Sequence, residues 1–196
     1  MNTITVEKRN EQLKAKQLRR KGIVPCCIFG GSLPNSISIQ MEEKTAEKLL
    51  RKQRLGSKVQ LKLEDQTIVT QIKDSSRCFT DSKIEHINFQ ALDPKTKVNS
   101  LAHVILENAE FVTGVLDKML MEVPYASLPE DMIDTVTVDL EGKPIGTIIT
   151  VADIPEFLSD RIELQVEKDS IIIRILKRNM LLQGMQSRQP NNGYIE

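Results

Sequence analysis

The first half of the chain alternates between apolar and polar residues over several short stretches. Residues 36–41 read Ser-Ile-Ser-Ile-Gln-Met, and residues 58–63 and 67–72 lie on either side of Glu64-Asp65-Gln66. A period of two places successive side chains on opposite faces of a β-strand, and polar residues between two such stretches indicate a hairpin. We predict strands at residues 3–6, 24–29, 36–41, 58–63, 67–72 and 83–92.

The last of these predicted strands separates its two faces clearly. Its apolar residues Ile87, Phe89 and Ala91 share one face, and His86, Asn88 and Gln90 share the other. One face should therefore contribute to a core while the other presents polar groups outward.

Helical spacing occurs at two places between the strands. A basic segment, Gln12–Lys21, precedes Gly22, and Ala46, Leu49 and Leu50 recur at i, i+3 and i+4 among charged residues. We predict a short helix at each place.

The second half changes character after a turn-forming segment at residues 93–97. Its β-branched stretches predict strands at 135–140, 147–151, 161–166 and 170–176. Residues 177–196 lose this periodicity and end in Gln, Asn, Pro and Gly, which is typical of a mobile tail. The predicted fold is mainly β with a few helices (α+β), in a domain at 1–93, a β-rich domain at 94–176 and a tail at 177–196.

The charge is divided unevenly, although the chain of 196 residues has no net charge. Residues 1–93 hold 17 Lys and Arg against 11 Asp and Glu, whereas residues 94–196 hold 10 against 16. A basic domain followed by an acidic one suggests that the first binds a polyanion. Chance unevenness between two solvated surfaces is the alternative.

Several classes of protein are disfavoured by composition. No apolar run reaches the ~18 residues that a membrane span needs, and the first twelve residues are mostly polar or charged where a signal peptide would be apolar. We therefore expect a cytoplasmic protein without a membrane partner. Cys26 and Cys27 are neighbours that do not readily bridge each other, and no Cys or His spacing suggests zinc. We expect reduced thiols, no metal and no cofactor.

The densest feature is a basic segment near the N-terminus. Seven cations fall within the first 21 residues: Lys8, Arg9, Lys14, Lys16, Arg19, Arg20 and Lys21. Such a segment suits phosphate binding, because each neutralised phosphate releases condensed counterions. A solvated helix face is the alternative interpretation.

Three further features could take part in binding. His86 and Asn88 would present donors and acceptors together, which suits hydrogen bonds to RNA, and Phe29 before Gly30-Gly31 could stack on an unpaired base. An ordinary polar strand face and a core Phe before a turn are the alternatives.

His103 lies in an apolar stretch, where a structural role is expected. No glycine-rich nucleotide-binding motif is present, so no small-molecule substrate is expected.

These segments together resemble the bacterial large-subunit ribosomal protein twenty-five family (bL25), including its longer two-domain general-stress (Ctc) form. Arg9 with Gln12 and Lys14, then residues 18–25 (LRRKGIVP) and 28–31 (IFGG), are similar to its N-terminal signature, and residues 85–89 (EHINF) to its His-containing strand. Residues 123–124, 128–130 and 151–155 resemble segments of the longer form. The resemblance covers nearly the whole chain apart from the last 20 residues.

The resemblance implies a six-stranded β-barrel-like first domain that binds an internal loop of 5S rRNA in the 50S subunit, with neighbouring ribosomal proteins as further partners. It implies RNA contacts at Arg9, Lys14, Arg19, Arg20, Phe29, Gln71, His86 and Asn88. Leu13, Phe29 and Asn88 stand where the family usually has glycine, tyrosine and aspartate. The segment between Gln71 and His86 is about two residues longer than expected and lacks the usual Arg-x-Pro step.

The expected function is thus a structural constituent of the large ribosomal subunit, with a divergent or stress-related paralogue as a close variant. A hypothesis from another class is a protein-interaction module that has lost RNA binding. An enzyme that uses Cys26 or Cys27 with His86 is the remaining alternative, although no orienting residue can be assigned.

Overall fold

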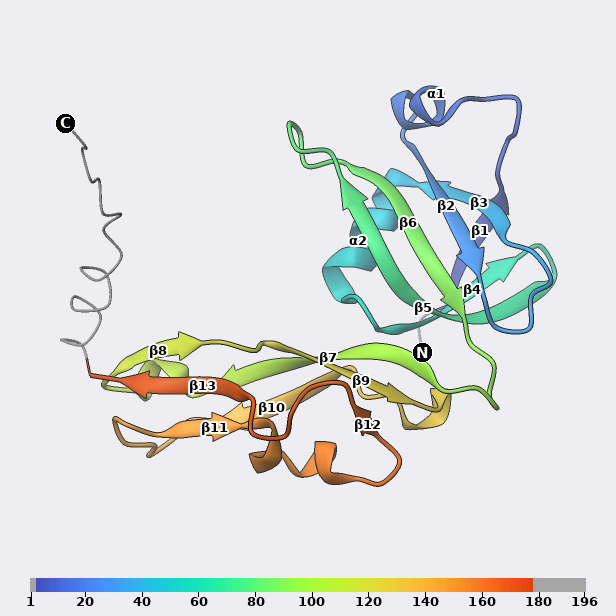
Figure 1. The fold of residues 1–196 in the computed structure, drawn as a ribbon. Coiled ribbons are helices and arrows are strands. Elements are labelled where there is room, and N and C mark those ends of the chain that lie inside the picture. Colours follow the sequence, from blue (N-terminus) through green and yellow to red (C-terminus); the bar gives the residue numbers. More distant parts are fainter. Residues whose placement is uncertain (1–2, 178–196) are drawn as a thin grey trace, which may run out of the picture. The chain divides into compact units, whose positions relative to one another are not determined.

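Six strands of the first half close into a barrel in the computed structural model, which describes residues 3–177. The strands are β1 (Thr3–Lys8), β2 (Ile23–Phe29), β3 (Ile37–Glu42), β4 (Lys58–Leu63), β5 (Gln66–Arg77) and β6 (Ile84–Ala91). Their order around the barrel is β1-β3-β2-β6-β5-β4 (Figure 1). The parallel pairing of β1 with β4, with Thr3 opposite Gln60, completes the circle, so the sheet has no free edge. The expected six-stranded barrel is confirmed.

The barrel interior is filled by apolar side chains from all six strands. The predicted core face of β6 is confirmed, because Ile87, Phe89 and Ala91 are buried while His86 and Asn88 remain partly exposed. Both predicted helices form, as α1 (Ala15–Arg20) and α2 (Glu43–Lys52). Helix α2 adds Ala46 and Leu49 to the core of the barrel, and α1 is anchored by the fully buried Leu18.

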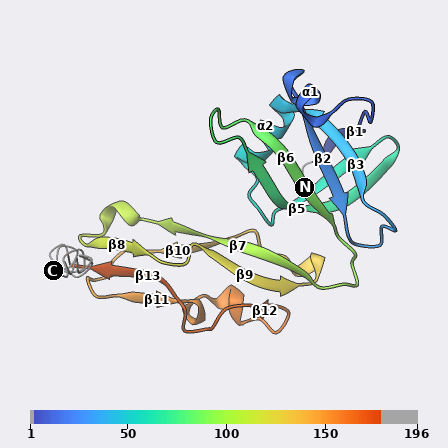
Figure 2. The same cartoon turned by 45° about the horizontal axis from the view of Figure 1, so that its top comes forward.

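Strand β5 is longer than its sequence pattern predicts. The predicted hairpin with β4 is confirmed, but β5 runs on to Arg77, with register shifts between Ile72 and Asp74 and between Ser76 and Arg77. A β-bulge breaks the alternation of faces, so a pattern of period two ends at the first bulge although the strand continues. The extended β5 and β6 form a hairpin that projects beyond the rest of the barrel (Figures 1 and 2).

Seven further strands follow in the described residues up to 177: β7 (Val98–Glu107), β8 (Val115–Lys118), β9 (Glu122–Ser127), β10 (Thr135–Asp139), β11 (Ile148–Thr150), β12 (Glu163–Leu164) and β13 (Ile171–Leu176). They form one sheet of order β10-β7-β9-β12 and another of order β11-β13-β8. Short 3-10 helices lie between them: η1 (Ala109–Phe111), η2 (Pro129–Asp131), η3 (Val151–Asp153) and η4 (Pro155–Leu158). The expected β-rich second half is confirmed.

The predicted strand at 161–166 forms only in part. Glu163 and Leu164 pair with Ala126 and Tyr125, and Gln165 then donates its backbone N–H to the carbonyl of Pro124. Proline has no N–H to return, which explains why the regular ladder ends there.

The chain divides into two compact units whose boundaries cross the sequence more than once. One unit contains the barrel with residues 3–102, together with Pro124–Asp134 and Asp160–Gln165. The other contains His103–Val123, Thr135–Ser159 and residues 166–177. The predicted tail lies outside the described residues, apart from Lys177. No helix among residues 3–177 is both long and apolar enough to cross a membrane.

Candidate nucleic-acid interface

A row of side chains crosses the outer face of neighbouring barrel strands. Arg9 follows β1 and donates its backbone N–H to Ser38 of β3 at 3.1 Å. Ser38 lies opposite Cys27 of β2, and Cys27 lies opposite Asn88 of β6. Residues opposite one another in register share a face, and neighbouring strands lie ~4.8 Å apart, so this row spans about 14 Å. It brings together Arg9 and Asn88, two residues that are 79 positions apart in the sequence.

His86 and Asn88 form a bonded pair on this face. The Nε2 atom of His86 lies 3.0 Å from the Oδ1 atom of Asn88. With Nε2 as donor, the ring Nδ1 atom is an acceptor and the Asn88 amide still has two N–H donors. The pair therefore offers both kinds of hydrogen-bonding group, as the sequence predicts for this strand.

A second row contains Phe29, Gln90 and Gln71, which lie opposite one another on β2, β6 and β5. Phe29 and Gln90 are partly exposed, but Gln71 is fully buried. Its Nε2 atom donates to Gln90 Oε1 at 2.9 Å and to the backbone oxygen of Asn99 at 3.1 Å. In this arrangement Gln71 holds the side chain of Gln90 in place.

Helix α1 places its cations beside β6. Arg19 donates from Nη1 to the Glu85 backbone oxygen at 3.3 Å, and its Nη2 lies 3.9 Å from Glu85 Oε1. Glu85 directly precedes His86, so this contact fixes the helix next to the polar pair. Lys14, Lys16 and Arg20 of the same segment are exposed. Exposed cations on an ordered segment can neutralise phosphates with little desolvation.

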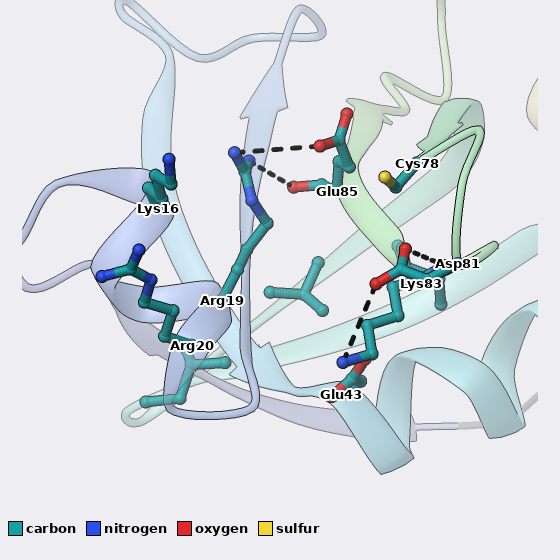
Figure 3. Close-up of a pocket in the computed structure, with 11 residues that line it drawn as sticks. Lys16, Arg19, Arg20, Glu43, Cys78, Asp81, Lys83 and Glu85 are labelled. Atoms are coloured by element: carbon teal, nitrogen blue, oxygen red, sulfur yellow. Dashed lines mark hydrogen bonds and ion pairs between the residues drawn. The ribbon is translucent and has the colours of Figure 1, made fainter.

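A pocket of about 190 Å³ lies between α1 and the β5–β6 hairpin (Figure 3). The cations that line it are Lys16, Arg19, Arg20 and Lys83, and its acidic lining residues are Glu43, Asp81 and Glu85. The pKa of Asp81 is lowered mainly by a hydrogen bond from the Cys78 thiol. A hydrogen bond from the Lys83 backbone N–H lowers it further. Asp81 therefore stays ionised beside Lys83, whose Nζ lies 3.9 Å away.

One donor on the outer face has no protein partner. The Nε atom of Arg9 is buried and makes no hydrogen bond within residues 3–177. A buried donor without an acceptor is energetically unfavourable.

Cys26 lacks the properties of a catalytic nucleophile. All three are free thiols, and burial raises the pKa of Cys26 to about 12, which leaves it without nucleophilic thiolate near neutral pH. Within the described part of the chain, no three His, Cys, Asp or Glu side chains are grouped so that they could hold a metal ion. His103 is buried, with Nδ1 3.5 Å from Glu122 Oε1, which fits the structural role expected for it.

The structure thus gathers Arg9, Phe29, His86 and Asn88 on one face with Arg19 at its border, places Lys14 and Arg20 on the exposed surface of the α1 segment, and buries Gln71. Sequence reasoning missed Ser38 and Cys27, which complete the row to Arg9. The alternation of residues 36–41 does assign Ser38 to a polar face, but pairing partners are needed to show which face.

Two family models match the chain and together cover most of it. Residues 4–89 match the ribosomal L25p family, and residues 97–179 match the C-terminal domain of ribosomal protein TL5. Both describe ribosomal proteins, so the class is a ribosomal protein of two domains rather than an enzyme. The chain belongs to the bL25 family of large-subunit ribosomal proteins, in its long form with the TL5-type C-terminal domain.

Curated relatives carry the same name, large ribosomal subunit protein bL25. The relative from Cereibacter sphaeroides is 31% identical over 71% of this chain and 72% of its own length, and the one from Enterococcus faecalis is 27% identical over 80% and 79%. The relative from Caldanaerobacter subterraneus is 24% identical over 90% of each chain. The resemblance seen in the sequence motifs is confirmed.

Proposed function

We propose that this protein binds 5S rRNA as a structural constituent of the large ribosomal subunit in the cytoplasm. The observation that carries the proposal is the row from Arg9 to Asn88, with the bonded His86 beside it and the cations of α1 at its border. Cations give affinity for the phosphate backbone, while polar strand groups read shape, sugar hydroxyls and base edges.

The roles within this interface follow from exposure. The exposed cations Lys14, Lys16 and Arg20 contact phosphates together with Arg19. Arg9 contacts a phosphate or sugar through its guanidinium, and Phe29 offers a ring for stacking. His86 and Asn88 hydrogen-bond to the RNA. Gln71 is buried, so it acts by positioning Gln90 at the surface.

The test is a titration of the purified protein with 5S rRNA over a range of salt concentrations, with a transfer RNA as competitor. A Lys16→Glu/Arg20→Glu variant reverses two exposed charges of α1 and keeps the contact of Arg19 with Glu85. We expect this variant to bind at least tenfold more weakly, because it removes two phosphate contacts and adds repulsion.

The matched control is Lys118→Glu/Lys168→Glu, which makes the same change of charge at exposed positions outside the barrel. It should bind like the wild type. Two results would favour the protein-interaction module. The wild-type protein could fail to bind 5S rRNA at low salt, or the Lys16→Glu/Arg20→Glu variant could bind as tightly as the control variant.

A further inference from the structure

The β5–β6 hairpin carries an aromatic side chain that the protein does not cover. Phe79, between the end of β5 and the start of β6, is fully exposed. The other large apolar side chains of residues 3–91 are buried or partly buried. A lone exposed ring among polar neighbours lacks the apolar surroundings that form the core of a protein–protein interface.

The hairpin is ordered by its own hydrogen bonds. The backbone N–H of Cys78 donates to Lys83 O at 2.8 Å, and that of Ser82 donates to Cys78 O at 2.9 Å. Arg77 adds a side-chain hydrogen bond across the loop, because its Nη1 donates to Ser82 O at 3.0 Å. The ring of Phe79 therefore extends from a fixed support, so little chain entropy is lost when it makes contact.

The hairpin continues the strands that carry the proposed interface. Ser76 lies opposite His86, and Phe79 is three residues further along the chain, a distance of about 10 Å at most in extended backbone. Arg77 and Lys83 add exposed cations to the hairpin itself. At its base lies the pocket whose cations Lys16 and Arg20 come from α1 (Figure 3).

We propose that the hairpin at residues 77–84 is a second RNA-binding element in which Phe79 stacks on an unpaired base. The cations of the hairpin and of the pocket hold the phosphates on either side of that base. Stacking between bases and aromatic rings tolerates a charged surrounding, and RNA loops supply splayed bases. The inference rests on the proposed RNA binding and extends it to residues beyond the barrel face.

A tryptophan probe reports this contact directly, because the chain contains no Trp. A Phe79→Trp variant of the full chain is titrated with 5S rRNA, and the indole fluorescence is followed alongside an independent gel-shift measurement of binding. We expect the RNA to quench the indole fluorescence of the Phe79→Trp variant. The quenching should reach its plateau at the same RNA concentration as the gel shift. The control is Phe111→Trp at another exposed position, 70% exposed, whose fluorescence should stay nearly constant.

Substitutions separate stacking from simple apolar contact. Phe79→Ala should weaken binding roughly 5- to 150-fold, the range measured for loss of one stacked base, and Phe79→Leu should weaken it almost as much. If Phe79→Leu and Phe79→Ala bind as the wild type does and the indole of the Phe79→Trp variant is not quenched, the hairpin inference is wrong and the barrel proposal stands. If the wild-type chain does not bind the RNA at all, both are wrong.

Discussion

At the scale of single residues, two adjacent cysteines have opposite environments. Cys26 points into the barrel core and is 2% exposed, whereas Cys27 lies in the row between Ser38 and Asn88 on the outer face. Burial is the main reason why the pKa of Cys26 is raised to about 12. The two thiols therefore provide an internal control for accessibility of the proposed interface.

We predict that an alkylating reagent distinguishes them. In a Cys78→Ser background at pH 8, iodoacetamide should modify Cys27 and leave Cys26 intact, since only about one Cys26 thiol in ten thousand is ionised at that pH. Saturating 5S rRNA should slow the reaction of Cys27 severalfold, as followed by fragment-ion mass spectrometry. An unchanged rate at Cys27 with bound RNA would show that the RNA lies elsewhere.

Tyr125 of β9 gives a prediction for pH. Its hydroxyl donates to Ile133 O at 2.8 Å and accepts from Ile133 N–H at 2.7 Å, and burial raises its pKa above 10. Because the folded pKa exceeds the unfolded one, the neutral hydroxyl stabilises the fold below pH 10, and this contribution disappears as the pH rises through the folded pKa. Tyr125→Phe should lower the free energy of unfolding by about 1–3 kcal/mol.

The measurement uses the fact that the chain has two tyrosines. In a Tyr194→Phe variant, the ultraviolet absorbance of tyrosinate reports Tyr125 alone. Titration at the ordinary value near 10 would contradict the prediction.

At the scale of elements, the turn after β2 depends on glycine. Gly31 has φ +60°, and a Cβ atom there would lie 3.0 Å from the backbone oxygen of Ala91. Gly22 has a similar φ of +73°, but a Cβ atom there would meet nothing closer than 3.9 Å. The paired glycines at 30–31 thus allow a tight turn against β6.

The two glycines form a matched pair for mutagenesis. Gly22→Ala should destabilise the protein by about 1 kcal/mol through the left-handed backbone alone. Gly31→Ala should cost about 1 kcal/mol more, because Ala91 must also shift. Chemical denaturation measures both, and equal losses would mean that the contact with Ala91 relaxes freely.

A comparison of individual strands explains why the sequence predicts some elements and not others. Strands with one continuous buried face, such as β3 and β6, follow from alternation alone. The second half of β5 does not, because bulges reverse its pattern, and the pairing of β1 with β4 joins segments more than 50 residues apart. For the site, His86 and Asn88 follow from local pattern, whereas the burial of Gln71 depends on Asn99 from a distant segment.

At the scale of the whole molecule, net charge and binding are separate matters. The chain is neutral because a basic half offsets an acidic one. Counterion release depends on how many cations contact phosphates, so the slope of log affinity against log salt should reflect the barrel and not the total charge.

We therefore predict different salt slopes for two kinds of neutralising change. Lys16→Gln/Arg20→Gln should make the slope shallower by about 1.8, which corresponds to two phosphate contacts. Glu110→Gln/Glu141→Gln/Glu156→Gln alters a larger charge at exposed acidic positions and should leave the slope unchanged. Titrations of 5S rRNA over the same salt series compare the two. If the acidic substitutions change the slope as much as the basic ones, binding responds to overall charge, and the interface on the barrel loses its electrostatic support.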